Sequence, residues 1–302
     1  MKINIGVDVG GTKLLAAALS ETGEILHSVT SPTPRFDYEL TIQEIVALIG
    51  KIETALQITA PVGIGMPGSI APKSGLVQNA NSTWLNGRDF ITDLKSALSR
   101  DIRWSNDANC FSLSENTDGA AAGAHSVFGV IMGTGVGGGL VLNGNLINGP
   151  RSIGGEWGHC SLPFADKDEF QNAALCWCGH RGCIESWISG PALMHHHNLT
   201  AKAPAETTEQ VVTLAGQGNV VAKRSLDAHT QRTAKALAMV VNIFDPEVIV
   251  LGGGLSELEH LYDKLPALMA PYIFADAPMV DIRRPLFGAS SGVRGAARLW
   301  EF

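Results

Sequence analysis

The segment 6-GVDVGGTKLLAAAL-19 places a short apolar run, two glycines and a second apolar run in direct succession. Glycine carries no side chain and tolerates positive φ, so it suits a tight turn between two strands. A second segment, 129-GVIMGTGVGGGLVLNG-144, repeats this plan. Both predict a β-hairpin whose tip can turn consecutive backbone N–H groups toward an anion such as a phosphate. We therefore expect two related lobes that bind one polyphosphate.

The rest of the chain alternates short β-type apolar runs with helical periods, which is typical of α/β proteins. The expected strands are 3–9, 14–19, 62–66, 101–104, 126–132, 140–143 and 247–252. Apolar residues at helical spacing predict helices over 40–57, 89–99 and 227–243. The Gly/Ala-rich stretch 118-DGAAAGA-124 marks a domain boundary. We expect a small lobe over 1–117, to which a C-terminal helix over 290–302 returns, and a large lobe over 118–289.

Composition limits the function classes. The net charge is -7 and the 22 basic residues are scattered, which argues against nucleic acid as a partner. No leader-like N-terminus and no apolar run of about 18 residues is present, so we expect a cytoplasmic protein that does not bind membranes. Reducing conditions in the cytoplasm disfavour disulfides, so a cysteine cluster there favours a metal site or catalysis.

A third glycine cluster, 251-LGGGLS-256, follows a predicted strand. Within the central cluster, 133-GTGVGG-138 matches the dinucleotide fingerprint, but that fingerprint needs a following helix and the next residues read as strand and turn. The order of the three clusters resembles the actin/hexokinase-like (ribonuclease H-like) ATPase fold, in which two α/β lobes close over ATP. The resemblance implies these Mg-ATP contacts: Asp8, Gly10, Gly11, Thr12, Lys13, Gly133, Thr134, Gly135, Gly137, Gly138, Gly253 and Gly254.

Asp107, in 104-WSNDANC-110, lies where a strand passes into a helix. One interpretation is structural, because Asp and Asn are good N-cap residues worth about 1 kcal/mol. The other is catalytic: the positive field at a helix N-terminus keeps the carboxylate ionised, so that it can accept a proton from a substrate hydroxyl as that oxygen attacks a γ-phosphate. Cys110, inside this helix, is expected to be a small buried apolar residue.

Three of the five cysteines fall within 176-CWCGHRGCIE-185. Together with His159 they give the ligand set His159, Cys176, Cys178 and Cys183, which is typical of a closed, structural tetrahedral zinc site. Cys160 is a rival ligand, and reduced thiols without metal or a redox pair are the alternatives. Glu156 and Glu185 flank the ligands and are either sugar-binding carboxylates or solvated surface groups. His195, His196 and His197 are expected to be surface residues on a helix.

The stretches 8-DVGGTK-13, 67-PG-68, 106-NDAN-109, 133-GTGVGGG-139, 155-GEWGH-159 and 176-CWCGHRGCIE-185 together resemble the ROK family of bacterial sugar kinases and repressors. The resemblance covers essentially the whole chain. It implies an ATP-dependent kinase in which Asp107 is the base and zinc organises the sugar site without taking part in the reaction. The sugar contacts it implies are Gly68, Asn81, Asn106, Asp107, Glu156, His159 and Glu185. A homodimer is also expected.

Within the family, 79-NANSTWLNG-87 resembles the fructokinase/mannokinase branch. This favours fructose as substrate, phosphorylated at the 6-hydroxyl, with mannose and glucose as weaker substrates. N-acetylglucosamine kinase is the alternative. A sugar-responsive transcriptional regulator of the same family is disfavoured, since such proteins carry a helix-turn-helix segment before the first strand and here that strand begins at residue 3. An actin-type or heat-shock-type binding role needs no zinc site and is disfavoured too.

Overall fold

The structure is a computed structural model and describes residues 2–300. The chain forms two compact units. The first contains residues up to 125, 139–155 and those from 285 onward, and the second contains 126–138 and 156–284. The sequence-based division kept everything from 118 to 289 in one lobe. Residues 139–155 belong to the first unit because Gly139 packs directly on the helix that begins at Asp107: a Cβ on Gly139 would collide with Ser112 and with the carbonyl of Ala108.

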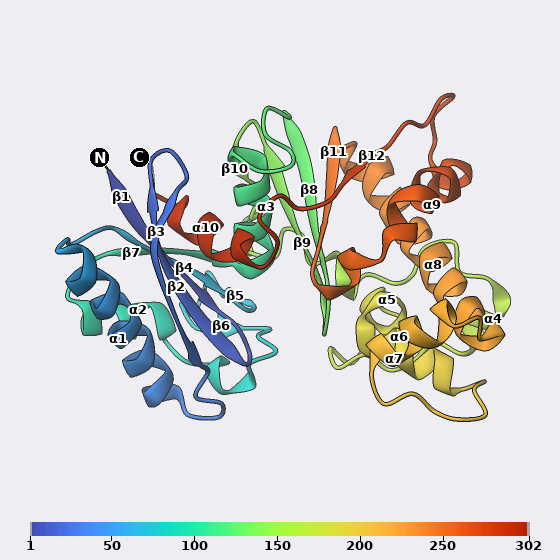
Figure 1. The fold of residues 1–302 in the computed structure, drawn as a ribbon, viewed down its shortest axis with the longest axis horizontal. Coiled ribbons are helices and arrows are strands. Elements are labelled where there is room, and N and C mark those ends of the chain that lie inside the picture. The colour runs from blue at the N-terminus through green and yellow to red at the C-terminus, as the bar shows by residue number, and fades with distance from the viewer. Residues whose placement is uncertain (1, 301–302) are drawn as a thin grey trace. The chain divides into compact units, whose positions relative to one another are not determined.

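A five-stranded sheet forms the centre of the first unit (Figure 1). Its strands, in spatial order, are β3 (Ile25–Pro32), β2 (Lys13–Ser20), β1 (Ile3–Val9), β4 (Val62–Met66) and β7 (Ile102–Asn106). β1 pairs antiparallel with β2, whereas β1, β4 and β7 run parallel. The carboxyl ends of these three parallel strands therefore meet at one edge, where open α/β sheets commonly bind ligands.

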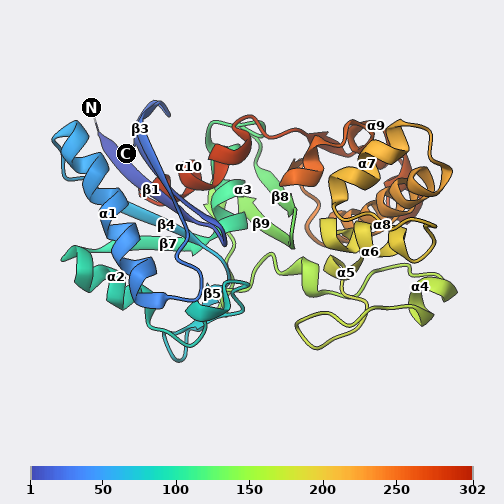
Figure 2. The same cartoon turned by 60° about the horizontal axis from the view of Figure 1, so that its bottom comes forward.

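One face of this sheet carries the apolar core of the first unit. Residues of alternating register, such as Ile5, Val7 and Ile64, are fully buried there. The helices α1 (Tyr38–Leu56) and α2 (Phe90–Leu98) cover this face and contact each other (Figure 2). Both helices begin and end within two residues of the bounds that apolar spacing predicts.

The opposite face of the sheet is lined with glycine. A Cβ on Gly6 or Gly63 would collide with the backbone of α10 (Ser291–Ala297). A Cβ on Gly65 would come within 3.2 Å of the Cys110 Sγ in α3 (Asp107–Thr117). Two helix backbones can thus approach the strands closely because side chains are missing along this face.

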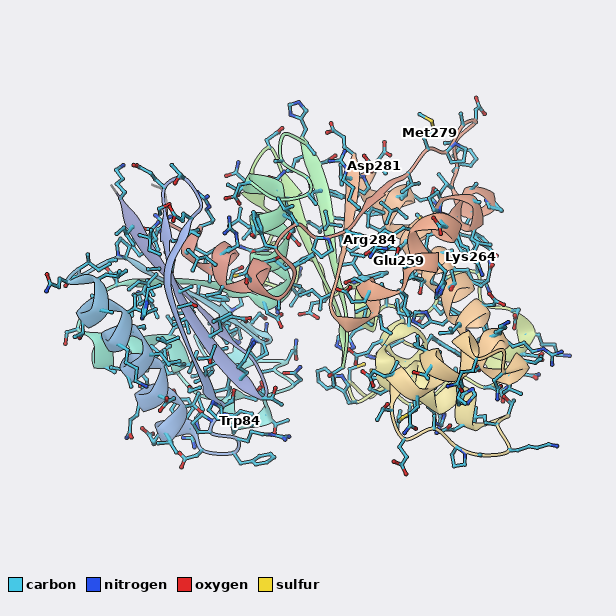
Figure 3. All side chains as sticks on the ribbon, in the orientation of Figure 1. Trp84, Glu259, Lys264, Met279, Asp281 and Arg284 are labelled. Atoms are coloured by element: carbon cyan, nitrogen blue, oxygen red, sulfur yellow. The ribbon has the colours of Figure 1, made fainter. Side chains whose placement is uncertain are left out.

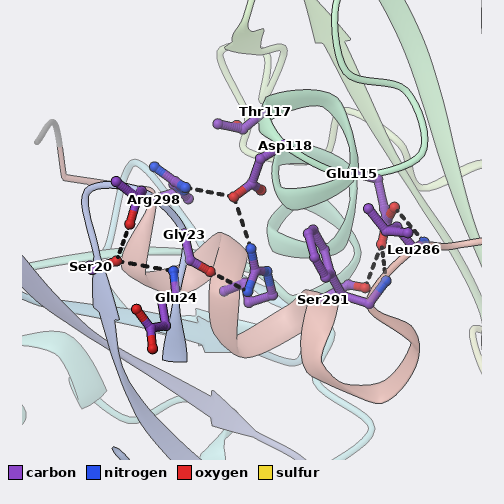
Figure 4. A network of polar contacts seen from close by, with 12 residues as sticks. Ser20, Gly23, Glu24, Glu115, Thr117, Asp118, Leu286, Ser291 and Arg298 are labelled. Carbon is purple, nitrogen blue, oxygen red and sulfur yellow. Dashed lines mark hydrogen bonds and ion pairs between the residues drawn. The ribbon is translucent and has the colours of Figure 1, made fainter. Parts of the chain in front are cut away.

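Buried polar contacts hold α10 and the chain before it against α3 (Figure 4). The Glu115 carboxylate is fully buried and accepts hydrogen bonds from the backbone N–H of Ala120 and Leu286 and from the Ser291 hydroxyl, at 2.6–2.9 Å. Arg294 and Arg298 both pair with Asp118, at 2.8 and 2.6 Å. The same unit contains the short elements β5 (Ser69–Ile70), β6 (Val77–Gln78) and β10 (Asn145–Leu146).

The second sheet has the order β10, β9 (Val136–Leu142), β8 (Ser126–Met132), β11 (Val248–Gly252) and β12 (Asp281–Arg283). β8, β11 and β12 are parallel. Around them the second unit carries α4 (Lys167–Gln171), α5 (Glu185–Ile188), α6 (Gly190–Asn198), α7 (Thr208–Gly216), α8 (Val220–Phe244) and α9 (Glu259–Met269). An ion pair between Arg284 and Glu259 ties the end of β12 to α9 (Figure 3).

Some elements differ from the sequence-based expectation. The strand predicted over 140–143 begins at Val136, inside the glycine run, so only 133–135 form the turn. β3 was not predicted because its polar and apolar residues lie at an edge and are only partly buried. The helix expected over 227–243 begins earlier, at Val220. Among residues 2–300, no helix is both long and apolar enough to cross a membrane.

Candidate functional site

Two carboxylates of the first unit, Asp8 and Asp107, lie at the carboxyl ends of parallel strands. Asp8 lies beside Gly65 in the register of β1 and β4, and Gly65 lies beside Ser105 in β7. Asp107 follows two residues after Ser105, as the first residue of α3. Gly65, on the strand between the two acids, has no side chain, and the Cys110 side chain of α3 packs against it.

Burial controls the charge of both acids. Burial, and then the neighbouring charge of Asp107, raise the pKa of Asp8 to about 7, against a smaller opposing effect of Lys13. Burial also raises the pKa of Asp107, although hydrogen bonds from the Ala108 N–H and from Asn106 lower it. The start of the helix therefore lowers the pKa of Asp107, as predicted, but the effect of burial is larger and the net shift is upward. A carboxylate with a raised pKa is a better proton acceptor than an ordinary one.

The raised pKa of Asp8 predicts a pH-dependent stability. An unfolded Asp ionises near pH 3.8, whereas folded Asp8 ionises near pH 7. The folded state binds the extra proton between these values, so stability falls as pH rises through this window. Asp8→Asn removes the burial cost of the charge, and we expect it to raise the unfolding temperature of the nucleotide-free protein at about pH 8, but little at about pH 4. Calorimetry at both values checks this, and an equal shift at both would contradict it.

The predicted phosphate turn is a tight and exposed hairpin between β1 and β2. The Gly10 N–H donates to the Lys13 carbonyl at 3.1 Å, which leaves Gly11 and Thr12 at the tip. The hydroxyl of Thr33, the residue directly after β3, donates to the Gly10 carbonyl at 2.7 Å and anchors the turn. This supporting residue was not predicted, since β3 itself was not.

Asn106 caps α3 and also joins it to the turn before β5. Its side-chain oxygen accepts from the Ala108 N–H at 2.9 Å, and its amide donates to the Gly68 carbonyl at 3.0 Å. Gly68 has φ of +69°, and a Cβ there would collide with the backbone near Ala80. The predicted sugar contacts Gly68 and Asn106 are thus brought together. Asn106, and not Asp107, provides the cap, so capping does not account for Asp107.

Asn81 lies exposed in a loop that Asn86 shapes. The Asn86 side chain accepts from the Ala80 N–H and donates to the Ala80 carbonyl, both at 2.9 Å. Gly87 follows with φ of +76°. In 79-NANSTWLNG-87, Asn86 and Gly87 therefore stabilise the backbone conformation of the loop.

In the second unit, the predicted metal ligands converge. The ligand atoms of His159, Cys176, Cys178 and Cys183 all lie within 4.8 Å of one another. The Cys178 and Cys183 sulfurs are 3.5 Å apart, and the Cys176 sulfur is 3.7 Å from the His159 Nδ1. Zinc–sulfur bonds of about 2.3 Å in a tetrahedron place ligand atoms about 3.7 Å apart. The cluster fits a zinc ion. Cys160 is exposed and outside the cluster.

Backbone hydrogen bonds also hold these loops. The Leu162 N–H donates to the Gly182 carbonyl and the Ile184 N–H to the Cys160 carbonyl, at 2.9 and 2.8 Å. Gly179 and Gly182, at φ of +91° and +72°, provide the sharp turns. Cys110, by contrast, is buried in α3 as expected.

Glu185 begins α5 beside the cluster, and its carboxylate reaches the central glycine turn. Its Oε2 accepts from the Val136 N–H at 2.9 Å, and its Oε1 accepts from the Trp177 Nε1–H at 2.6 Å. A Cβ on Gly135 would lie 2.8 Å from the carboxylate. The missing side chain of Gly135, one of the predicted nucleotide contacts, makes room for Glu185. The partly buried Glu156 precedes the short 3-10 helix Trp157–His159, and the His159 N–H donates to its carbonyl.

A cavity of about 480 Å³ lies in the second unit beside this turn. Gly133, Thr134 and Gly254 of the predicted nucleotide set line it. Gly138 and Gly253 allow close packing, since a Cβ would collide with Phe128 and with the Met132 backbone, respectively. The Gly137 carbonyl accepts from the Trp157 Nε1–H. Sequence reasoning missed the walls of this cavity: Gly190, Pro191, Met194, Glu206, Thr207, Thr208, Glu209, Val212, Leu255 and Leu258. The helix-start signal 189-SGP-191 could have located part of them.

The three consecutive histidines lie on α6, as predicted, but not all are surface residues. His195 is exposed, whereas His196 stacks on Trp187 with ring centroids 4.7 Å apart. His197 is 1% exposed and its Nδ1 hydrogen-bonds with Ser225 at 3.1 Å. The surface prediction was wrong for His197, because the three side chains point in different directions around the helix.

A family model described as the ROK family matches residues 4–302. The chain belongs to the ROK family. Two N-acetyl-D-glucosamine kinases, from Haemophilus influenzae and Photobacterium profundum, are 35% and 36% identical to it. These alignments cover 98% and 97% of this chain and 98% of each relative. A ROK family glucokinase from Streptomyces griseus, solved in complex with glucose and AMPPNP, is 26% identical, with a TM-score of 0.81 over 98% of both chains.

Proposed function

We propose that this ATP-dependent sugar kinase of the ROK family phosphorylates N-acetyl-D-glucosamine at its 6-hydroxyl. The observation that carries the proposal is the similarity to two N-acetyl-D-glucosamine kinases over essentially the full length of all three chains. The comparisons thus favour the alternative over fructose. The segment 79-NANSTWLNG-87, which favoured fructose, is weak support because Asn86 and Gly87 serve the path of the loop.

In this proposal Asp107 accepts the proton of the sugar 6-hydroxyl as the hydroxyl oxygen attacks the γ-phosphorus of ATP. The bond from that phosphorus to the β–γ bridging oxygen breaks, and ADP leaves. The raised pKa of Asp107 suits this role, because a base works best when its pKa approaches the working pH. The sugar contacts in this proposal are Gly68, Asn81, Asn106, Glu156, His159 and Glu185. Polar groups that bind a sugar hydroxyl discriminate against sugars that leave them unpaired.

Nucleotide contacts are proposed in both units. In the second unit, the cavity lined by Gly133, Thr134 and Gly254 takes the nucleotide, with Pro191 and Met194 as apolar walls for the base. In the first unit, the exposed turn 10–13 contributes backbone N–H groups and Lys13 to the phosphates. When bound, Mg²⁺ neutralises phosphate charge. Asp8, ionised above about pH 7, would help to hold it.

We also propose one structural zinc ion held by His159, Cys176, Cys178 and Cys183. The Nδ1 of His159 lies 3.7 Å from the Cys176 sulfur. With Nδ1 as the metal ligand, Nε2 on the other side of the ring would bind a sugar hydroxyl. A metal-bound imidazole has a fixed tautomer and orientation, which favours a directed hydrogen bond.

The substrate proposal is tested by comparing kcat/KM for N-acetylglucosamine, N-acetylmannosamine, glucose, mannose and fructose in an ADP-release assay. We expect N-acetylglucosamine to exceed fructose by about 100-fold or more, because a site built for the acetamido group leaves polar atoms unpaired with a sugar that lacks it. If fructose gave the highest value, the substrate proposal would be wrong while the kinase assignment stood.

A further inference from the structure

Trp177 lies between two predicted zinc ligands, and its side chain is 58% exposed. Its indole N–H and its aromatic ring nevertheless both contact other residues. The indole Nε1–H donates to Glu185 Oε1 at 2.6 Å. The ring meets the His159 ring edge-on, with centroids 4.9 Å apart and planes at 87°. One side chain therefore contacts two of the proposed sugar contacts, Glu185 and His159.

The Glu185 carboxylate is held from two directions. The Trp177 indole bonds Oε1, and the Val136 backbone N–H bonds Oε2 at 2.9 Å. Each carboxylate oxygen can accept more than one hydrogen bond, so both retain acceptor capacity for sugar hydroxyls. Of the two donors, the backbone donor cannot be removed by a simple substitution. The Trp177 indole N–H is therefore the donor to Glu185 that a substitution can remove.

The backbone around Trp177 is well fixed. The Cys176 N–H donates to the His180 carbonyl at 2.7 Å, and the Gly179 N–H donates to the Cys176 carbonyl at 2.9 Å. This tight turn fixes the position of the Trp177 backbone, from which the indole projects. Its exposure argues against a core-packing role, because an aromatic side chain contributes to the core through the apolar area that it buries.

We propose that Trp177 is a positioning residue for sugar binding: it holds the Glu185 carboxylate and the His159 ring in the orientations that receive the sugar hydroxyls. The inference rests on the proposed function only in taking Glu185 and His159 as sugar contacts. It predicts that loss of the indole N–H weakens sugar binding and leaves ATP binding and zinc content unchanged.

The test compares Trp177→Phe with wild type. Phenylalanine keeps an aromatic ring near His159 but removes the donor to Glu185. We expect the KM and Kd for the sugar to rise about tenfold, as for the loss of a charge-assisted hydrogen bond, while kcat and the KM for ATP change by less than about twofold. Leu175→Ala is the matched control, since Leu175 is 64% exposed in the same loop. We expect it to behave as wild type.

A double-mutant cycle separates positioning from direct contact. If Trp177 acts through Glu185, Trp177→Phe should change the sugar Kd by less than about twofold in a Glu185→Ala background, measured by calorimetry without ATP. An equal effect in both backgrounds, or unchanged affinity in the single variant, would overturn the inference. The sugar used is the one that wild type phosphorylates best. The sugar preference of the wild type tests the substrate proposal, and the response to Trp177→Phe tests the role of Trp177 separately.

Discussion

Asp107→Asn should lower kcat by about 10²–10⁴, the usual contribution of a positioned general base. Asparagine has nearly the same shape as aspartate, and its oxygen can still accept from the Ala108 N–H that Asp107 now bonds at 2.8 Å. The start of α3 is kept in any case by Asn106, which is its N-cap. The variant therefore removes the proton acceptor and leaves the helix in place. Steady-state kinetics with saturating sugar and ATP measure the effect.

Asp101→Asn is the matched control for this substitution. Asp101 immediately precedes β7, at the opposite end of the strand from Asp107, and its side chain is 82% exposed in a surface ion pair with Lys95. Such pairs contribute about 1 kcal/mol or less, so turnover should stay near wild type. The role of Asp107 as base would be excluded if Asp107→Asn kept kcat within about threefold of wild type, because a lost base costs far more.

The second large effect concerns the metal cluster. Cys178→Ser should reduce the zinc content from about one ion per chain to well below that, because serine does not supply a thiolate. The loss frees the His159 ring, which is itself a ligand and a proposed sugar contact. We therefore expect kcat/KM for the sugar to fall by about 100-fold, the upper end of what the loss of support around a metal site costs. Elemental analysis of untagged protein and kinetics are measured on the same sample.

Cys160→Ser provides the control, since Cys160 adjoins His159 in sequence but lies exposed outside the cluster. It should keep both zinc and activity. Full activity in metal-free protein would refute the organising role of zinc. Equal zinc loss in both cysteine variants would show that the ligand set is misassigned.

Patterns that depend on local chemistry could be predicted from the sequence. The β1–β2 hairpin follows from two adjacent glycines between apolar runs, and the structure has its strands at Ile3–Val9 and Lys13–Ser20. The metal cluster follows from ligand type and spacing, and the four ligand atoms converge. The start of α3 at Asp107 follows from the polar residues after an apolar strand.

Features that depend on distant packing could not be predicted. The missing side chain of Gly135 also makes room for Glu185, and this role depends on a residue fifty positions later in the chain. The pKa of Asp8 depends on burial and on Asp107, neither of which a single strand reveals. The buried Glu115 reads as an ordinary helical glutamate until its partners, Leu286 and Ser291, are known.

The central claim is ATP-dependent phosphorylation of N-acetylglucosamine at its 6-hydroxyl. Proton–phosphorus correlation NMR of the product formed with Mg-ATP tests it most directly. The account predicts a new phosphate resonance coupled to both protons on carbon 6 of the sugar. This resonance should be absent from a reaction of the same duration in which the Asp107→Asn variant takes the place of the wild-type enzyme. A spectrum without any sugar phosphate above the ATP-only control, or with phosphate coupled to a different carbon position, would contradict it.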